Sequence, residues 1–118
     1  MDAQRFGIVI KVNELECCRL FYRDLLDLGE PMIDSSFFTV FQLQPGLTLT
    51  LEKSPAKYLE RASSTIEWRF ETANLTVLKQ RLEAAGYALE FDELHRGPGR
   101  YWRGRDPEGN FFLVREAE

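Results

Sequence analysis

The chain contains the same arrangement of segments twice. An extended apolar segment at 6–12 leads into a helical pattern that begins near Leu15, and a second extended segment at 66–72 leads into a helical pattern that begins near Leu75. The two leucines occupy equivalent positions about half the chain apart, and strand-like segments follow each helix. One strand–helix–strand copy leaves a face of its sheet uncovered, so we expect the two copies to pair around a cleft.

This repeat predicts a single α+β domain spanning 1–118. We expect two βαβββ modules, at about 5–53 and about 65–116, that pair into a cupped mixed sheet with the helices on its outer face. The segment between them, about 54–64, contains a proline and several serines and is predicted to be a linker.

Asparagine precedes both helical patterns. Asn13, with Glu16 three residues later, has the form of a capping box, and Asn74 is predicted to cap the second helix. Gly29 and Gly86 stand where left-handed helix ends are expected. The apolar residues at helical spacing in the first pattern are predicted to face the core: Cys18, Phe21, Tyr22, Leu25 and Leu28.

Charge and cysteine content exclude several classes of protein. Fifteen basic and nineteen acidic residues give a net charge of −4, which argues against a nucleic-acid-binding surface. No apolar run approaches the roughly 20 residues that cross a bilayer, and the first residues lack the pattern of a signal peptide. Cys17 and Cys18 are adjacent and therefore poor disulfide partners. We expect a cytoplasmic protein with no nucleic-acid or membrane partner.

Three segments in order, 13–29, 78–86 and 106–111, resemble the vicinal-oxygen-chelate superfamily, which includes glyoxalase I, bleomycin-resistance proteins and extradiol dioxygenases. The third is the turn Asp106-Pro107-Glu108-Gly109-Asn110 before the last strand. The resemblance implies the paired βαβββ fold and a homodimer in which subunits complete each other's clefts. The resemblance also implies a metal site, because the superfamily's enzymes hold a divalent metal ion with His or Gln, Glu and His side chains.

The implied metal ligands match this sequence poorly. The four positions fall on Gly7, Glu67, Leu113 and either Thr50 or Glu52. None is a histidine, and His95 lies outside all four. Two carboxylates alone would hold at most a weak Mg²⁺ or Ca²⁺. We therefore predict no metal and no cofactor.

Strand alternation predicts which side chains face the cleft. The ligand-binding residues predicted in this way are Lys11, Thr50, Glu52, Glu67, Arg69 and Leu113. The resemblance to bleomycin-resistance proteins, which hold flat ligands with aromatic rings, adds Tyr101 and Trp102. The charged members can instead pair with one another on a solvated sheet, and the aromatic members can instead pack in the core or in a dimer contact. A basic cluster at Arg96, Arg100, Arg103 and Arg105 either receives an anionic ligand group or is a solvated hairpin.

These observations support three functional hypotheses. The first is a metal-independent protein that binds, and in one version sequesters, a small organic ligand, with no catalytic residue. The alternative is a metal-dependent lyase, isomerase or dioxygenase with a non-standard site built on Glu52 and Glu67. The third is an interaction module whose cleft is vestigial. The residues favour the first.

Overall fold

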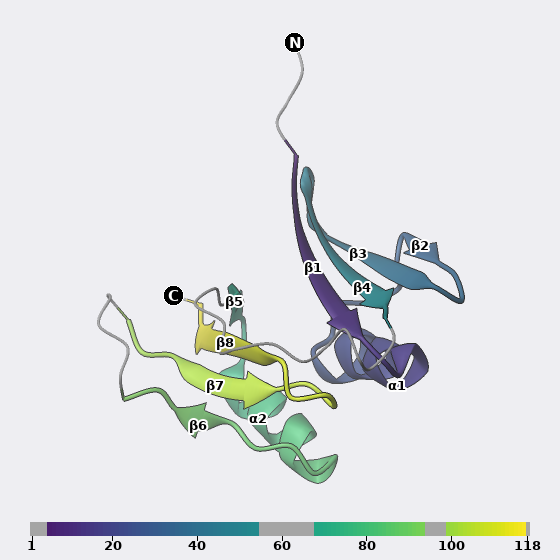
Figure 1. The fold of residues 1–118 in the computed structure, drawn as a ribbon. Helices are drawn as coiled ribbons and strands as arrows, with labels where there is room; N and C mark the ends of the chain where they lie inside the picture. The colour runs from purple at the N-terminus through teal and green to yellow at the C-terminus, as the bar shows by residue number, and fades with distance from the viewer. Residues whose placement is uncertain (1–4, 55–67, 94–98, 118) are drawn as a thin grey trace. The chain divides into compact units, whose positions relative to one another are not determined.

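A computed structural model describes residues 5–54, 68–93 and 99–117 of the chain. The chain divides into two compact units, residues 1–63 and 64–118 (Figure 1). Each unit contains a four-stranded mixed sheet and a helical segment between its first and second strands. The predicted α+β class and the two βαβββ modules are confirmed. Nearly all of the expected linker lies outside the described residues.

The first unit contains four strands, which form one sheet. Its elements are β1 (Phe6–Val12), α1 (Leu15–Leu20), η1 (Phe21–Leu25), β2 (Ile33–Asp34), β3 (Phe38–Gln44) and β4 (Leu47–Lys53). The strand order is β1-β4-β3-β2, with β1 parallel to β4 and the other pairs antiparallel. Gly46, at φ 83°, makes the tight turn between β3 and β4.

The second unit repeats this topology. Its elements are β5 (Trp68–Thr72), α2 (Leu75–Ala84), β6 (Glu90–Phe91), β7 (Trp102–Arg105) and β8 (Phe111–Glu116). The strand order is β5-β8-β7-β6, and β5 runs parallel to β8. The order matches that of the first sheet strand for strand, so the internal repeat seen in the sequence is a repeat of structure.

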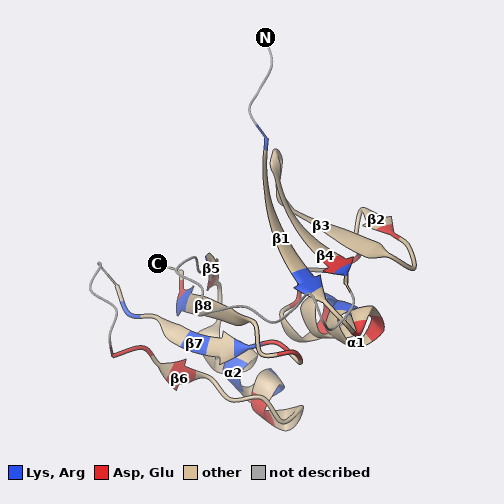
Figure 2. Cartoon of the chain, in the orientation of Figure 1, with Lys and Arg blue, Asp and Glu red and all other residues tan. Residues whose placement is uncertain are grey.

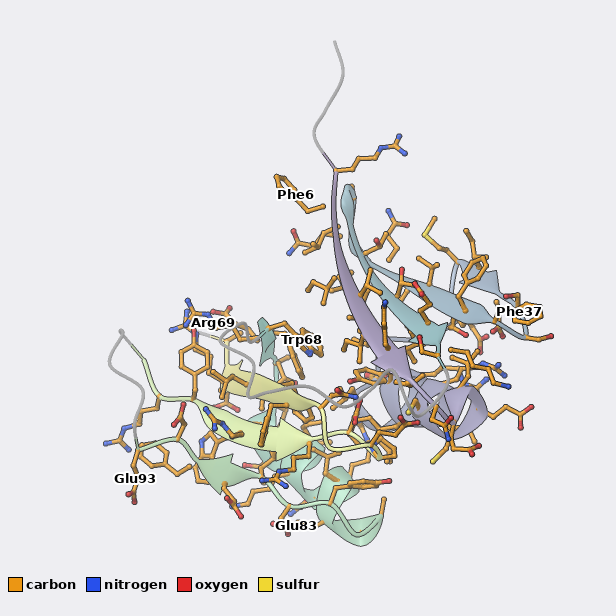
Figure 3. All side chains as sticks on the ribbon, in the orientation of Figure 1. Phe6, Phe37, Trp68, Arg69, Glu83 and Glu93 are labelled. Atoms are coloured by element: carbon orange, nitrogen blue, oxygen red, sulfur yellow. The ribbon has the colours of Figure 1, made fainter. Side chains whose placement is uncertain are left out.

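One face of each sheet is buried, as alternation predicts. In the first unit Ile10, Val12, Leu49 and Leu51 are buried on the side that packs against α1. Phe6 belongs to the same row by alternation, yet it is 64% exposed (Figure 3). The row therefore meets the helix only along the second half of β1.

The first helix begins near Leu15 as predicted, but it is not capped as predicted. Glu14, not Asn13, occupies the N-cap position, and no side chain caps the helix. The Asn13 side-chain amide instead donates to the Glu14 carboxylate at 3.4 Å. The capping box predicted for Asn13 and Glu16 is therefore wrong, because a local sequence pattern does not fix the backbone path that leads from β1 into α1.

A π-turn changes which side chains of this helix are buried. In η1 the Leu26 N–H donates to the Phe21 carbonyl at 3.0 Å, a bond that spans five residues instead of four. The wider turn places Leu26 in the core, where it is 4% exposed, while Leu25 is only half-buried. The predicted core positions Cys18, Phe21 and Tyr22 are confirmed.

The second helix follows its prediction. The Asn74 side-chain oxygen accepts a hydrogen bond from the Val77 N–H at 3.1 Å, so the predicted cap is confirmed. Leu78 and Leu82 are buried, and Gly86 ends the helix at φ 91°. None of the described helical segments has the length and apolarity that a membrane crossing requires.

Local turn chemistry explains the segment 106–110. Asp106 is 3% exposed, and one of its carboxylate oxygens accepts from the backbone N–H groups of Glu108 and Asn110, each at 2.9 Å. Its other oxygen accepts from the Asn110 side-chain amide at 2.9 Å. Both carboxylate oxygens of Asp106 thus hold the turn into β8.

Candidate functional site

Charged and aromatic side chains gather on the face of the second sheet opposite α2. The register pairs Arg69 of β5 with Leu113 of β8, and pairs Arg103 of β7 with the same leucine. Alternation places the neighbouring odd-numbered residues on this face as well. We call it the arginine face and define it by Arg69, Glu71, Tyr101, Arg103, Arg105, Phe111, Leu113 and Arg115.

Two arginines cover the ring of Tyr101. The Arg69 guanidinium carbon lies 5.0 Å from the ring centroid and that of Arg115 lies 5.4 Å from it. Glu71 fixes Arg115 through Nε at 2.8 Å and Nη2 at 2.5 Å. Tyr101 is only 6% exposed, although it lies on the face opposite α2. The arginines hold the aromatic ring in a defined cation–π arrangement.

A second pair of arginines lies over Phe111. The guanidinium carbons of Arg103 and Arg105 are 5.1 Å and 4.5 Å from the centroid of this ring. Arg103 also reaches Asp92, with 3.8 Å between Nη2 and Oδ2. Figure 2 shows the basic residues along β7 and the acidic residue on its neighbour β6. The four guanidinium groups thus contact two aromatic rings on a single face.

Leu113 stands at the centre of the arginine face, where the superfamily resemblance implies a carboxylate ligand. It is 4% exposed and lies between Arg69 and Arg103 in the register. An apolar side chain flanked by guanidinium groups offers no ligand to a divalent cation and repels it electrostatically. No group of three His, Cys, Asp or Glu side chains gathers within residues 5–54, 68–93 and 99–117. The described residues therefore do not fit the metal.

Glu67 and His95 lie outside the described residues. The position that Glu67 was predicted to take in the cleft therefore remains a prediction.

Three predicted residues lie together on the open face of the first sheet. Lys11 and Glu52 are direct neighbours across β1 and β4, and Thr50 lies opposite Val9. Lys11 and Glu52 are exposed and Thr50 is half-buried. At the remaining implied ligand position, Gly7, an added Cβ would meet the Thr48 hydroxyl at 3.3 Å. This face offers hydroxyl groups and one charge of each sign.

Trp102 lies on the other side of the second sheet from Tyr101. It pairs with the buried Val114, and the Lys79 ammonium group of α2 lies 4.6 Å from its ring centroid. The structure therefore does not bring Trp102 together with Arg69 and Tyr101. The signal was present in the sequence, because adjacent residues of a strand point to opposite faces. Trp102 instead lines a hollow of about 260 Å³ near the start of α2.

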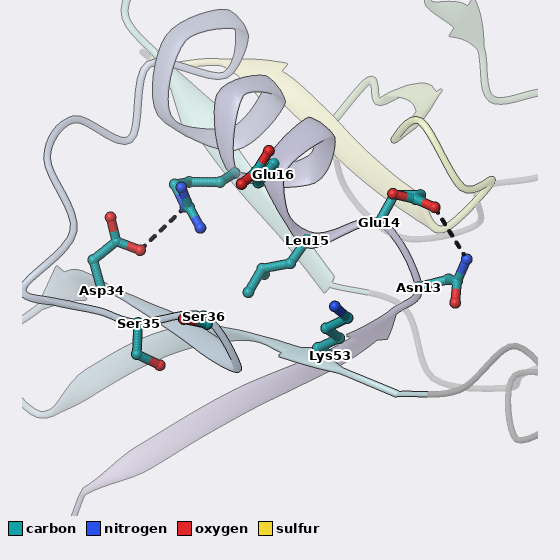
Figure 4. Close-up of a pocket in the computed structure, with 9 residues that line it drawn as sticks. Asn13, Glu14, Leu15, Glu16, Asp34, Ser35, Ser36 and Lys53 are labelled. Carbon is teal, nitrogen blue, oxygen red and sulfur yellow. Dashed lines mark hydrogen bonds and ion pairs between the residues drawn. The ribbon is translucent and has the colours of Figure 1, made fainter.

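Sequence reasoning missed a polar hollow of about 510 Å³ beside the start of α1 (Figure 4). Arg19 Nε lies 3.1 Å from Asp34 Oδ1 and donates to the Thr39 hydroxyl at 3.3 Å, and this hydroxyl donates to Asp34 at 2.9 Å. Thr39 is fully buried and holds Arg19 and Asp34, which line the hollow, through these hydrogen bonds. Their contacts join α1 to β2 and β3, and a local pattern does not predict such distant pairing. The hollow is lined by Asn13, Glu14, Leu15, Glu16, Arg19, Asp34, Ser35, Ser36 and Lys53.

Comparison with known proteins gives matches in structure alone. No protein-family model and no curated protein matches the sequence. A glyoxalase/bleomycin resistance protein from Catenulispora acidiphila is 19% identical, with a TM-score of 0.70, and the match covers 98% of this chain and 100% of that one. A lactoylglutathione lyase from Agrobacterium tumefaciens is 21% identical, with a TM-score of 0.65 and coverage of 98% and 95%.

A genomically encoded fosfomycin resistance protein from Listeria monocytogenes is 18% identical, with a TM-score of 0.70 and coverage of 100% and 96%. These three proteins differ in the activities that their names state, so the likeness carries the fold and not a reaction. Together they show that the chain has the fold of these proteins, which is the fold that the resemblance of its three sequence segments to the vicinal-oxygen-chelate superfamily implied.

Proposed function

We propose that this protein binds a small organic ligand without a resident metal ion, and that the arginine face belongs to the binding surface. The observation that carries the proposal is the placement of Leu113. It puts an apolar side chain between Arg69 and Arg103 where the superfamily resemblance implies a metal-binding carboxylate. Sites for small molecules combine apolar and aromatic surface with a few convergent polar groups, and this face contains both.

Each group on the arginine face has a distinct part in this proposal. Leu113 and Tyr101 form the buried base of the face, and the exposed guanidinium group of Arg69 orients the ligand. Glu71 holds Arg115 over the Tyr101 ring before any ligand arrives. Such preorganisation lowers the entropy lost on binding, because the side chains are already ordered.

On the first sheet the proposal assigns ligand contacts to Lys11, Thr50 and Glu52. Two observations support this assignment. The three residues share an open face on β1 and β4, and they present charged groups and a hydroxyl group there. Glu67 is kept as a proposed contact from strand alternation alone. A homodimer and a cytoplasmic location are proposed from the sequence, and sequestration of a toxic compound is one role for such a binder.

Native mass spectrometry of the full chain, purified without added metal or chelator, tests the absence of a resident metal. We expect a mass free of stoichiometric divalent metal, with or without a copurified organic molecule. One tightly bound divalent ion per chain, whose removal abolishes an activity, would instead support the alternative enzyme built on Glu52 and Glu67.

A fragment screen followed by amide NMR tests the location of binding. We expect bound fragments to shift the signals of Arg69, Leu113 and Tyr101. Lys79 and Trp102, on the helix side of the same sheet, serve as the internal control and should shift less. Shifts concentrated on the helix side, or in the hollow beside α1, would contradict the proposed surface.

A further inference from the structure

We infer that the ligand carries an anionic oxygen group, a carboxylate or a phosphoryl group, and that Arg69 and Arg105 are the guanidinium groups of the arginine face that receive such a group. The inference rests on the proposed function and names the chemical class of its ligand. It follows from the pairing of charges on the arginine face, from the orientation of the guanidinium groups and from the apolar centre of the face.

The charges on this face are arranged by strand. The carboxylates stand on the outer strands or just beyond them: Glu71 on β5, and Glu90 and Asp92 on and after β6. Glu71 is engaged by Arg115, and Asp92 by Arg103. Within the described part of the chain, Arg69 and Arg105 have aromatic contacts but no carboxylate in ion-pair distance. Two exposed guanidinium groups thus remain available to an external anion.

The aromatic contacts determine how these arginines can bind. Arg69 lies over Tyr101 and Arg105 lies over Phe111, at 5.0 Å and 4.5 Å from the ring centroids. A guanidinium group that lies over an aromatic ring still has N–H donors that can be directed away from the ring. These donors form a planar fork that matches two oxygens of a carboxylate or phosphoryl group. A neutral or cationic group lacks that match.

Leu113 strengthens an ionic contact at its side, and the guanidinium groups beside it select a negative charge. It is buried between Arg69 and Arg103, so it excludes water from the centre of the face. Charge interactions are stronger where the local dielectric constant is lower. In this chain, guanidinium groups would supply positive charge for a ligand oxygen at the place where the superfamily's enzymes use a metal cation.

The test compares ligands that differ in charge alone. Benzoate, benzyl alcohol and benzylamine have similar size and are anionic, neutral and cationic; inorganic phosphate is the anion without a ring. Each is titrated into the full chain while the Nε–Hε signals of the arginines are followed by NMR. We expect benzoate and phosphate to shift the signals of Arg69 and Arg105, and benzyl alcohol and benzylamine to leave them in place.

Paired variants assign the binding to these residues. The double variant Arg69→Gln/Arg105→Gln should weaken benzoate binding about tenfold or more, the loss expected for a principal charge-assisted contact. Arg5→Gln/Arg23→Gln removes the same charge from the first unit and should leave the affinity unchanged. Leu113→Glu should abolish benzoate binding and Leu113→Met should retain it. If Leu113→Glu does not fold, the arginine double variant decides.

The outcomes separate this inference from the proposed function. Equal binding of benzyl alcohol and benzoate on this face would overturn the anionic class and leave the proposed function standing. An unchanged affinity for benzoate in the double variant would also overturn the inference. Failure of every anion to bind up to about 10 mM, where even weak sites are occupied, would overturn it too. The copurified ligand and the fragment screen would still test the proposed function.

Discussion

A Cβ atom on Gly99 would lie 2.5 Å from Nη1 of Arg115. The guanidinium group therefore occupies space that any other residue at position 99 would fill. Arg115 in turn lies over Tyr101 and pairs with Glu71. Gly99 also adopts φ +86°, a conformation that glycine tolerates best. Gly99 thus leaves the space that one of the four arginines occupies.

Replacing this glycine should disturb Arg115 specifically. Gly99→Ala is expected to shift the Nε–Hε NMR signal of Arg115 and to lower stability by about 1–2 kcal/mol through its positive φ. Gly109→Ala is the matched control, because Gly109 has φ +88° and no neighbour within 4 Å of its added Cβ. It should lose similar stability in thermal unfolding and leave the Arg115 signal in place. Equal shifts in both variants would contradict the contact.

The two asparagines before the helices should differ in their effect on stability. Asn74→Ala removes the hydrogen bond to the Val77 N–H and should cost about 1 kcal/mol. Asn13→Ala removes no cap and should change the free energy of unfolding by less than about 0.5 kcal/mol. Urea unfolding of both variants measures the difference. A larger loss from Asn13→Ala would show that this residue has a role the structure does not give it.

The π-turn predicts which of two adjacent leucines matters more. Leu26→Ala should destabilise the protein by about 2–5 kcal/mol, because Leu26 is buried. Leu25→Ala should cost clearly less, since Leu25 is half-buried. A regular α-helix from Phe21 onward would reverse the order, so the ranking of the two variants in chemical denaturation tests the π-turn itself.

One carboxylate should titrate below its usual range. The hydrogen bond from Arg23, at 2.9 Å, lowers the pKa of Asp24. Because the pKa of the folded state is the lower one, this pair stabilises the protein at neutral pH and loses its contribution as the pH falls through that pKa. Both side chains are partly or fully exposed, so the effect on stability is small. NMR titration of Asp24 should show its pKa rising in Arg23→Gln.

The sequence predicts the fold well because its signals are repeated and local. Leu15 and Leu75 mark equivalent helices, and Asn74 and Gly86 bound the second helix through their own backbone chemistry. The capping box of α1 was predicted wrongly because Asn13 has the residue type of a cap but does not occupy the N-cap position. A period of 3.6 residues also does not reveal a bond that spans five residues, so Leu26 was not expected in the core.

The candidate site was predictable only in part. Alternation places Arg69 and Leu113 on one face, and the register makes them neighbours. The same rule separates Tyr101 from Trp102, which had been grouped by residue type. The stacking of Arg69 and Arg115 on Tyr101 depends on side-chain conformation and on Gly99, and no pattern of residue types encodes it. The hydrogen-bonded side chains of Arg19, Asp34 and Thr39 come from segments that are distant in the sequence. They were missed because no pattern of residue types encodes their contact.

The arginine face also predicts how pH and salt would affect the proposed binding of an anionic ligand. Histidine and carboxylate ligands must be deprotonated before they hold a metal, so metal binding by such ligands depends on pH. Arginine keeps its charge throughout the physiological pH range. Association with the exposed guanidinium groups of Arg69 and Arg105 would therefore be indifferent to a moderate change in acidity. It would instead weaken as ionic strength rises, because dissolved salt screens exposed charges over about 10 Å at 0.1 M.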